Sequence, residues 1–139
     1  MVLGIFVLIG GFAVVLSMDS YRSYNVHSER SLLLGVLLKA RSQAMANVNQ
    51  KNHGVHFDQP GVTYTLFQGL NYASRDPSFD IIFKSNPSYT LTGAIDVIFN
   101  QLNGKPNAPD SITLDDHALA VFNVCINSEG QINEKATCP

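Results

Sequence analysis

Two cysteines, Cys125 and Cys138, are the residues whose chemistry could mark this chain most clearly, because a bond between them would be covalent. A disulfide that closes a loop of this size stabilises a fold by about 3 kcal/mol. The alternative is a pair of free thiols in a cytosolic protein. Because the chain opens with an apolar stretch and has no other cysteine, we expect the disulfide and an oxidising, exported location. The absence of CxxC and CxxCH motifs argues against a zinc ribbon or a covalently bound haem.

A second candidate for chemistry is the stretch PDSITLDDHA, which contains Asp110, Asp115 and Asp116. Carboxylates near a loop are ligands that calcium accepts. The spacing is not that of an EF-hand and no glycine makes the turn, so we treat these residues as weak calcium candidates and favour a solvated loop. His53 and His56 differ by three positions, which puts them on opposite faces of a strand and gives poor metal geometry.

The sequence contains no motif that points to catalysis. It has no GxSxG serine motif and no phosphate-binding P-loop. We therefore expect no catalytic residue, no resident metal and no cofactor, and a protein that is not an enzyme. The net charge of −2 without a long run of one sign argues against a dedicated nucleic-acid binder. A length of 139 residues suits one domain plus an appendage.

The appendage is the opening stretch MVLGIFVLIGGFAVVLSMDSYRSY, whose first charged side chain is Asp19. No basic region precedes the apolar residues and VLSMDS is a poor cleavage site, which argues against a signal peptide. Met1–Met18 comes close to the roughly 20 residues that a membrane-spanning helix needs. A buried helix of a soluble protein is the less favoured alternative, because no later segment is apolar enough to enclose it.

An amphipathic helix is expected to follow without a break. The segment SERSLLLGVLLKARSQAMANVNQ has no proline and places Leu33, Leu37, Ala40 and Ala44 on one stripe at helical spacing. We expect these four residues to pack the helix onto a sheet. One continuous helix from Met1 to about Val48 would be roughly 70 Å long. Its first half suits lipid or other helices, and its second half suits one face of a folded domain.

The remaining sequence has the alternation and turn residues of short strands. Strands are predicted at 54–57, 62–67, 79–83, 89–92, 94–102, 111–114 and 118–127, with a last short strand after the turn NSEGQIN. We therefore predict an α+β fold, with one long N-terminal helix on a small, mostly antiparallel sheet. The predicted organisation is a hydrophobic helix at 1–18, an amphipathic helix at 19–49 and a β-rich head at 50–139.

The order VLGIFVLIGGFAVVLS, SLLLGVLLKARSQAMANVNQ and HGVHF, closed by VCINSEGQINE, resembles type IV pilin-like proteins of the GspH/FimT minor-pilin and pseudopilin branch. The resemblance covers three blocks and leaves residues 60–118 unmatched. In that family a basic leader and a glutamate near the start of the mature helix come first. Neither is present here, and we expect that this sequence starts inside the family's hydrophobic helix.

The resemblance implies a structural subunit of a type IV pilus or a type II secretion-like filament, with a C-terminal disulfide between Cys125 and Cys138. Its partners would be copies of itself or related pilins, an inner-membrane assembly platform and, before assembly, the lipid bilayer. Its location would be the cell membrane and then an extracellular or periplasmic filament. The assembly residues would be those of the apolar helix: Val2, Leu3, Ile5, Phe6, Leu8, Ile9, Phe12, Val15 and Leu16.

Two other functions stay open from the sequence. A minor pilin can act as a tip module that captures DNA or another ligand, but the tail NEKATCP has one lysine and one glutamate, so it lacks the basic character that DNA capture needs. Nucleic acid is thus an unexpected partner. The last possibility is a single-pass anchored extracytoplasmic domain unrelated to pili.

Overall fold

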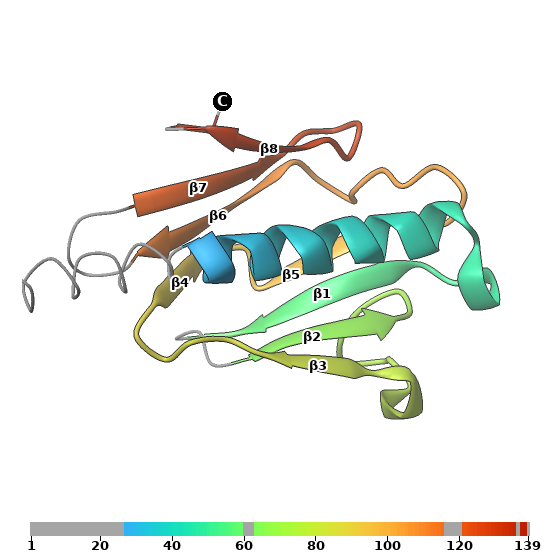
Figure 1. Cartoon of the computed structure of the whole chain (residues 1–139). Helices are drawn as coiled ribbons and strands as arrows, with labels where there is room; N and C mark the ends of the chain where they lie inside the picture. Colours follow the sequence, from blue (N-terminus) through green and yellow to red (C-terminus); the bar gives the residue numbers. More distant parts are fainter. Residues whose placement is uncertain (1–26, 60–62, 116–120, 136, 139) are drawn as a thin grey trace, which may run out of the picture.

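The computed structural model describes residues 27–59, 63–115, 121–135, 137 and 138. Within them, one helix of residues 27–45 lies against two four-stranded antiparallel sheets (Figure 1). The strand order is β3-β2-β1-β5 in the first sheet and β4-β6-β7-β8 in the second. The helix runs between the two sheets, with β3 and β8 at their outer edges (Figure 1).

The helix forms because its apolar side chains recur at the helical period and all meet the same core. Leu33, Leu37, Ala40 and Ala44 are each 0% exposed. The helix ends at residue 45. Two residues later, Asn47 takes a left-handed backbone conformation with φ of 54°. A short 3-10 turn, η1 (Val48–Gln50), follows. The predicted end near Val48 is therefore a few residues too late, because a left-handed residue cannot continue an α-helix.

The first sheet consists of β1 (His53–Asp58), β2 (Thr63–Gln68), β3 (Ile81–Lys84) and β5 (Asp96–Phe99). Its register aligns the apolar side chains that face the helix, with Val55 opposite both Leu66 and Val97. Gly54 lies where the ring of Phe67 crosses the strand: a Cβ there would meet Phe67 Cζ at 2.7 Å. A short 3-10 turn, η2 (Pro77–Phe79), precedes β3.

The second sheet consists of β4 (Thr90–Gly93), β6 (Asp110–Asp115), β7 (Val121–Ile126) and β8 (Ile132–Lys135). Ile112 on β6 lies opposite Val124 on β7, and both are fully buried. The helix and the inner faces of both sheets share one hydrophobic core. The predicted α+β fold is confirmed, but the strands divide into two sheets where we expected one.

The prediction of one strand over 94–102 is wrong at its C-terminal end. β5 stops at Phe99, which makes an isolated bridge with Pro106. The next residues turn: the N–H of Gly104 donates to the carbonyl of Asn100 at 2.9 Å, and Leu102 has a left-handed φ of 70°. Leu102 is apolar and extended the predicted strand, but Asn100, Asn103 and Gly104 favour the turn.

Candidate functional site

Near the first described turn of the helix, a buried carboxylate ties the helix to the first sheet. Glu29 is 5% exposed and accepts three hydrogen bonds. The hydroxyl of Tyr64 on β2 donates to Oε1 at 2.5 Å, and the hydroxyl of Ser85 donates to the same oxygen at 2.7 Å. The backbone N–H of Asn86 donates to Oε2 at 3.1 Å. The carboxylate therefore joins the helix to β2 and to the segment that follows β3.

All three donors to Glu29 are uncharged, and no salt bridge reaches it within the described part of the chain. Burial raises the pKa of the Tyr64 hydroxyl well above its usual 10, and its hydrogen bond to Glu29 raises this pKa further. The phenol is therefore protonated and able to donate at any physiological pH. Hydrogen bonds to a charged acceptor are shorter and stronger than neutral ones, so this set is a strong attachment point.

The next residue, Arg30, ties the same turn to the second sheet. Its Nε donates to Oε1 of Glu134 on β8 at 2.8 Å, and a second nitrogen pairs with the other carboxylate oxygen. Its guanidinium also lies 4.7 Å from the ring centroid of Phe122 on β7. Because both charged side chains are about a third exposed, the ion pair contributes at most about 1 kcal/mol. Together, Glu29 and Arg30 form a clamp that holds the helix to both sheets.

The other end of the helix is attached to the loops at the far end of the head. Nε of Arg41 donates to the carbonyl of Gly104 at 3.3 Å, and the N–H of Leu102 donates to the carbonyl of Ala44 at 2.8 Å. Lys105 pairs with Glu129 across the same region at 2.8 Å. Hydrogen bonds thus attach the described helix to the rest of the head near both of its ends.

The two cysteines form a disulfide, with their Cα atoms 5.4 Å apart. Cys125 lies on β7, opposite Asn133 of β8, and Cys138 follows β8. The bond therefore connects the C-terminal tail, which follows the edge strand β8, to the neighbouring strand β7. No free cysteine is present.

The weak calcium candidates do not converge. Asp110 and Asp115 are the first and last residues of β6, which separates their Cα atoms by roughly 16 Å at 3.3 Å per residue. One cation cannot be bound by both, and Asp116 lies outside the described residues. No group of three or more potential metal ligands occurs in the part of the chain that the structure describes.

The histidines of β1 lie on opposite faces of the strand, as their spacing indicates. His53 is buried, with Nδ1 3.1 Å from the carbonyl of Lys51, and burial lowers its pKa below the usual 6.5. His56 lies on the outer face, where Nδ1 is 2.7 Å from a carboxylate oxygen of Asp96.

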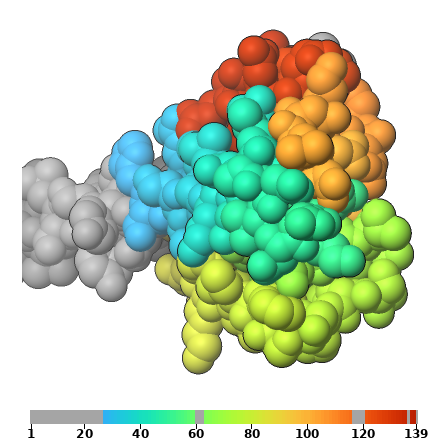
Figure 2. All heavy atoms as spheres, turned by 90° about the vertical axis from the view of Figure 1, so that its right-hand side faces the viewer, coloured from blue at the N-terminus to red at the C-terminus, as the bar shows by residue number. Residues whose placement is uncertain are grey.

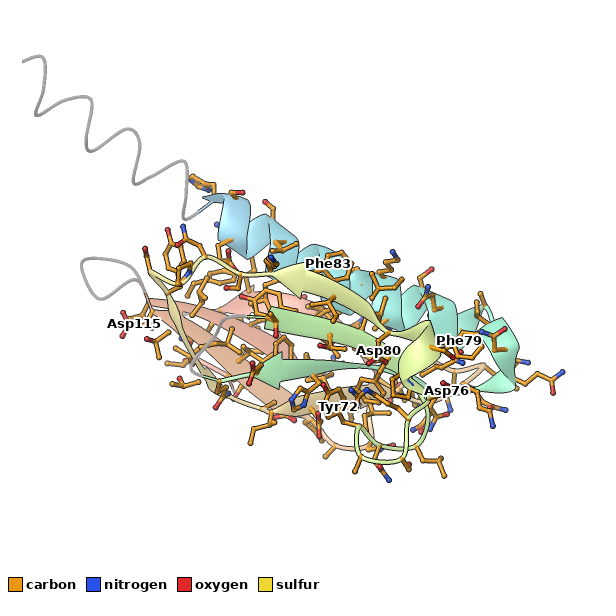
Figure 3. All side chains as sticks on the ribbon, turned by 90° about the horizontal axis from the view of Figure 1, so that it is seen from below. Tyr72, Asp76, Phe79, Asp80, Phe83 and Asp115 are labelled. Carbon is orange, nitrogen blue, oxygen red and sulfur yellow. A yellow bond between two sulfur atoms is a disulfide. The ribbon has the colours of Figure 1, made fainter. Side chains whose placement is uncertain are left out.

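Sequence reasoning missed a stack of side chains on the outer face of the first sheet. The ring of Tyr72 lies between an imidazole and a guanidinium. The His56 ring is stacked on it with the two centroids 3.6 Å apart, and the guanidinium carbon of Arg75 lies 3.5 Å from its centroid. Nε of Arg75 also donates to Asp80 at 2.7 Å. Figure 3, which views the molecule from below, labels Tyr72 and Asp80 toward the end of this sheet where η2 lies. The stack holds the loop between β2 and β3 against the outer face.

The predicted assembly residues from Val2 to Leu16 lie outside the described residues. Among the helices that are described, none is long and apolar enough to cross a membrane.

No protein-family model matches the sequence, and no curated protein matches it. Among solved structures, the type IV minor pilin FimU of Pseudomonas aeruginosa is similar, with a TM-score of 0.62 and 14% identity over 78% of this chain and 91% of that chain. The minor pseudopilin EpsH from the type 2 secretion system of Vibrio cholerae is also similar, with a TM-score of 0.56 and 14% identity over 78% of this chain and 94% of that chain. The chain therefore has a pilin-like fold, as the resemblance predicted.

Proposed function

We propose that this chain is a structural subunit, a pilin or pseudopilin, of a type IV pilus or a type II secretion-like filament. The observation that carries the proposal is a pilin-like head whose helix is preceded in the sequence by the apolar residues 1–17. Two structural neighbours that are named as a minor pilin and a minor pseudopilin support it. The role is structural and not enzymatic.

The mechanism is assembly by packing. The apolar segments of many subunits bundle in the filament core, and they exchange contacts with lipid for contacts with other helices. In the sequence, the Glu29–Arg30 clamp follows that segment, and it fixes the helix to both sheets of the head. The partners are copies of this chain or related pilins and the membrane platform that assembles them. The location is the membrane before assembly and an extracellular or periplasmic filament afterwards.

The test is fractionation of cells that carry the chain at its native locus. We expect the chain in material sheared from the cell surface or in an isolated secretion filament, with an intact mass that is two hydrogens below the reduced form. The variant Phe12→Lys should remain in the membrane fraction, because a charge in the helix core disrupts packing against apolar neighbours. The control Ile95→Lys changes a side chain of the head that is 55% exposed and should leave the distribution unchanged.

If the wild-type chain occurs only in the membrane fraction, the filament proposal is wrong and the chain is an anchored domain. If Phe12→Lys reaches the sheared fraction as efficiently as the wild type, assembly does not depend on the apolar segment.

A further inference from the structure

A groove lies at the end of the head that is opposite the clamp. It is bounded by η1, the end of β2 and the segment that leads into η2, and its volume is about 590 Å³. A smaller hollow of about 190 Å³ continues it toward β3 and shares Asn49, Gln68 and Phe79 with it. Figure 2 faces this end of the molecule, where the teal end of the helix borders the yellow-green segment from β2 to η2. The groove has the volume of a site for a few side chains of a ligand.

The walls of the groove carry large apolar side chains that the fold leaves in solvent. Leu70 is 75% exposed, Phe79 is 52% exposed and Ile81 is 40% exposed. Val48 of η1 adds a further apolar side chain from the helix side. Polar residues such as Asn49 and Gln68 surround them. A cluster of exposed apolar side chains with a polar rim is typical of a site for another protein.

The groove runs into an open edge of a sheet. Ile81, which lines the smaller hollow, is the first residue of β3, and β3 is the outermost strand of the first sheet. Within the described residues β3 pairs only with β2. Its other edge therefore offers backbone N–H and C=O groups to an added strand. The next residue, Ile82, is 63% exposed and points to the other face of the strand, so the edge of β3 carries an exposed apolar side chain on each face.

Two opposite charges lie at the rim of the groove. Lys51 lines it on the side of η1, and Asp76 lines it on the side of η2. Asp76 accepts hydrogen bonds from the N–H of Ser78 at 3.0 Å and from its hydroxyl at 2.6 Å, which lower the pKa of the carboxyl. Both bonds go to Oδ1, and the residue is exposed, so Oδ2 is available to a cation from outside. Figure 3 shows Asp76 and Phe79 together at this end of the head.

We propose that this groove and the edge of β3 bind an extended peptide segment of another protein. The segment adds a strand to β3 and places an apolar side chain between Leu70 and Phe79. A basic residue of the segment faces Asp76 and an acidic residue faces Lys51. Backbone bonds to an edge strand supply affinity in this mode of recognition, and the side-chain pocket supplies specificity. The proposal goes beyond the role of a filament subunit and does not rest on it.

The experiment selects peptides from a phage library of randomised seven-residue segments against the full chain held in lipid nanodiscs, with empty nanodiscs for counter-selection. We expect selected peptides to share an apolar residue with a basic residue on one side and an acidic residue on the other. Leu70→Ser and Phe79→Ser should each weaken binding by about tenfold or more, because each removes most of an apolar contact. Asp76→Asn keeps an oxygen for Ser78 and should weaken binding by about two- to fivefold. The control Val121→Ser changes a side chain that is 64% exposed on the other sheet and should have no effect.

A second measurement tests the strand geometry through the peptide, so it does not depend on how a variant folds. The added strand would donate only every second N–H to β3. N-methylation of one alternating set of peptide nitrogens should therefore abolish binding, and methylation of the other set should leave it intact. Equal loss for both sets, or peptides that bind the wild type and the groove variants equally, would overturn the proposal. Self-association of the chain that is lost in Leu70→Ser and Phe79→Ser would overturn it as well, because the occupant would then be a second copy.

Discussion

Replacing Tyr64 with phenylalanine isolates the strongest bond of the clamp. The ring remains packed edge-to-face on Phe57, with their centroids 5.5 Å apart, so the change removes only the hydroxyl. A hydrogen bond to a charged group contributes about 1.5–3 kcal/mol. Glu29 keeps the donors of Ser85 and Asn86, which places the expected loss in the lower half of that range, at about 2 kcal/mol. For a chain of this length that loss lowers the melting temperature by about 4–8 °C.

The assay is urea unfolding of the full chain in detergent, followed by far-ultraviolet circular dichroism. The matched control is Tyr72→Phe, because Tyr72 lies on the outer face of the first sheet, Glu29 accepts its hydrogen bond from Tyr64 instead, and the ring stack of Tyr72 survives the change. A double-mutant cycle with Glu29→Gln measures the coupling energy between Tyr64 and Glu29, which should exceed about 0.5 kcal/mol because the two residues are in contact. Equal losses for Tyr64→Phe and Tyr72→Phe, or a coupling energy near zero, would show that the bond does not hold the helix to β2.

Three further predictions concern the head, and the same unfolding assay measures each. Leu37→Ala should lower the free energy of unfolding by about 2–5 kcal/mol, because the Leu37 side chain is fully buried. Leu38→Ala, at a position 52% exposed, should lower it by less than about 0.5 kcal/mol. Similar losses would contradict the assignment of the buried face. Gly54→Ala should destabilise by about 1–3 kcal/mol through its clash with the Phe67 ring, while Gly35→Ala, with open space at its Cβ, should stabilise by up to about 1 kcal/mol. Because burial lowers the pKa of His53, the unfolded chain binds this proton more readily, so stability should fall as the pH drops below about 6.5, and His53→Gln should flatten that slope.

The helix and most strands could be predicted because their patterns are local. The helical period alone identified the stripe that the structure buries, and period-two alternation identified strands near β1 and β2. Alternation indicates which face of a strand is apolar but not which strand it pairs with. The division into two sheets follows from pairings such as Asp110 with Ile126 and Leu66 with Ile81, which no local pattern specifies.

The clamp was missed for the same reason. Glu29 interacts with residues 35 and 56 positions away, and a glutamate on a helix usually faces solvent. One signal was present in the sequence: Glu29 is four residues before Leu33 and so continues the buried stripe toward the N-terminus. A charged residue on an apolar stripe indicates a buried polar contact, because an unpaired buried charge is too costly to persist.

The clamp and the groove lie at opposite ends of the head, and this separation relates the two proposals. Glu29 and Arg30 are in the first described turns of the helix, whereas η1 and η2, which border the groove, lie at the other end of the head (Figure 1). A subunit that assembles through residues before the clamp would bring its neighbours to that end first. The groove would then stay accessible to an extended segment of a different protein. Variants of the groove should therefore leave assembly intact, and variants of the apolar segment should leave peptide binding intact.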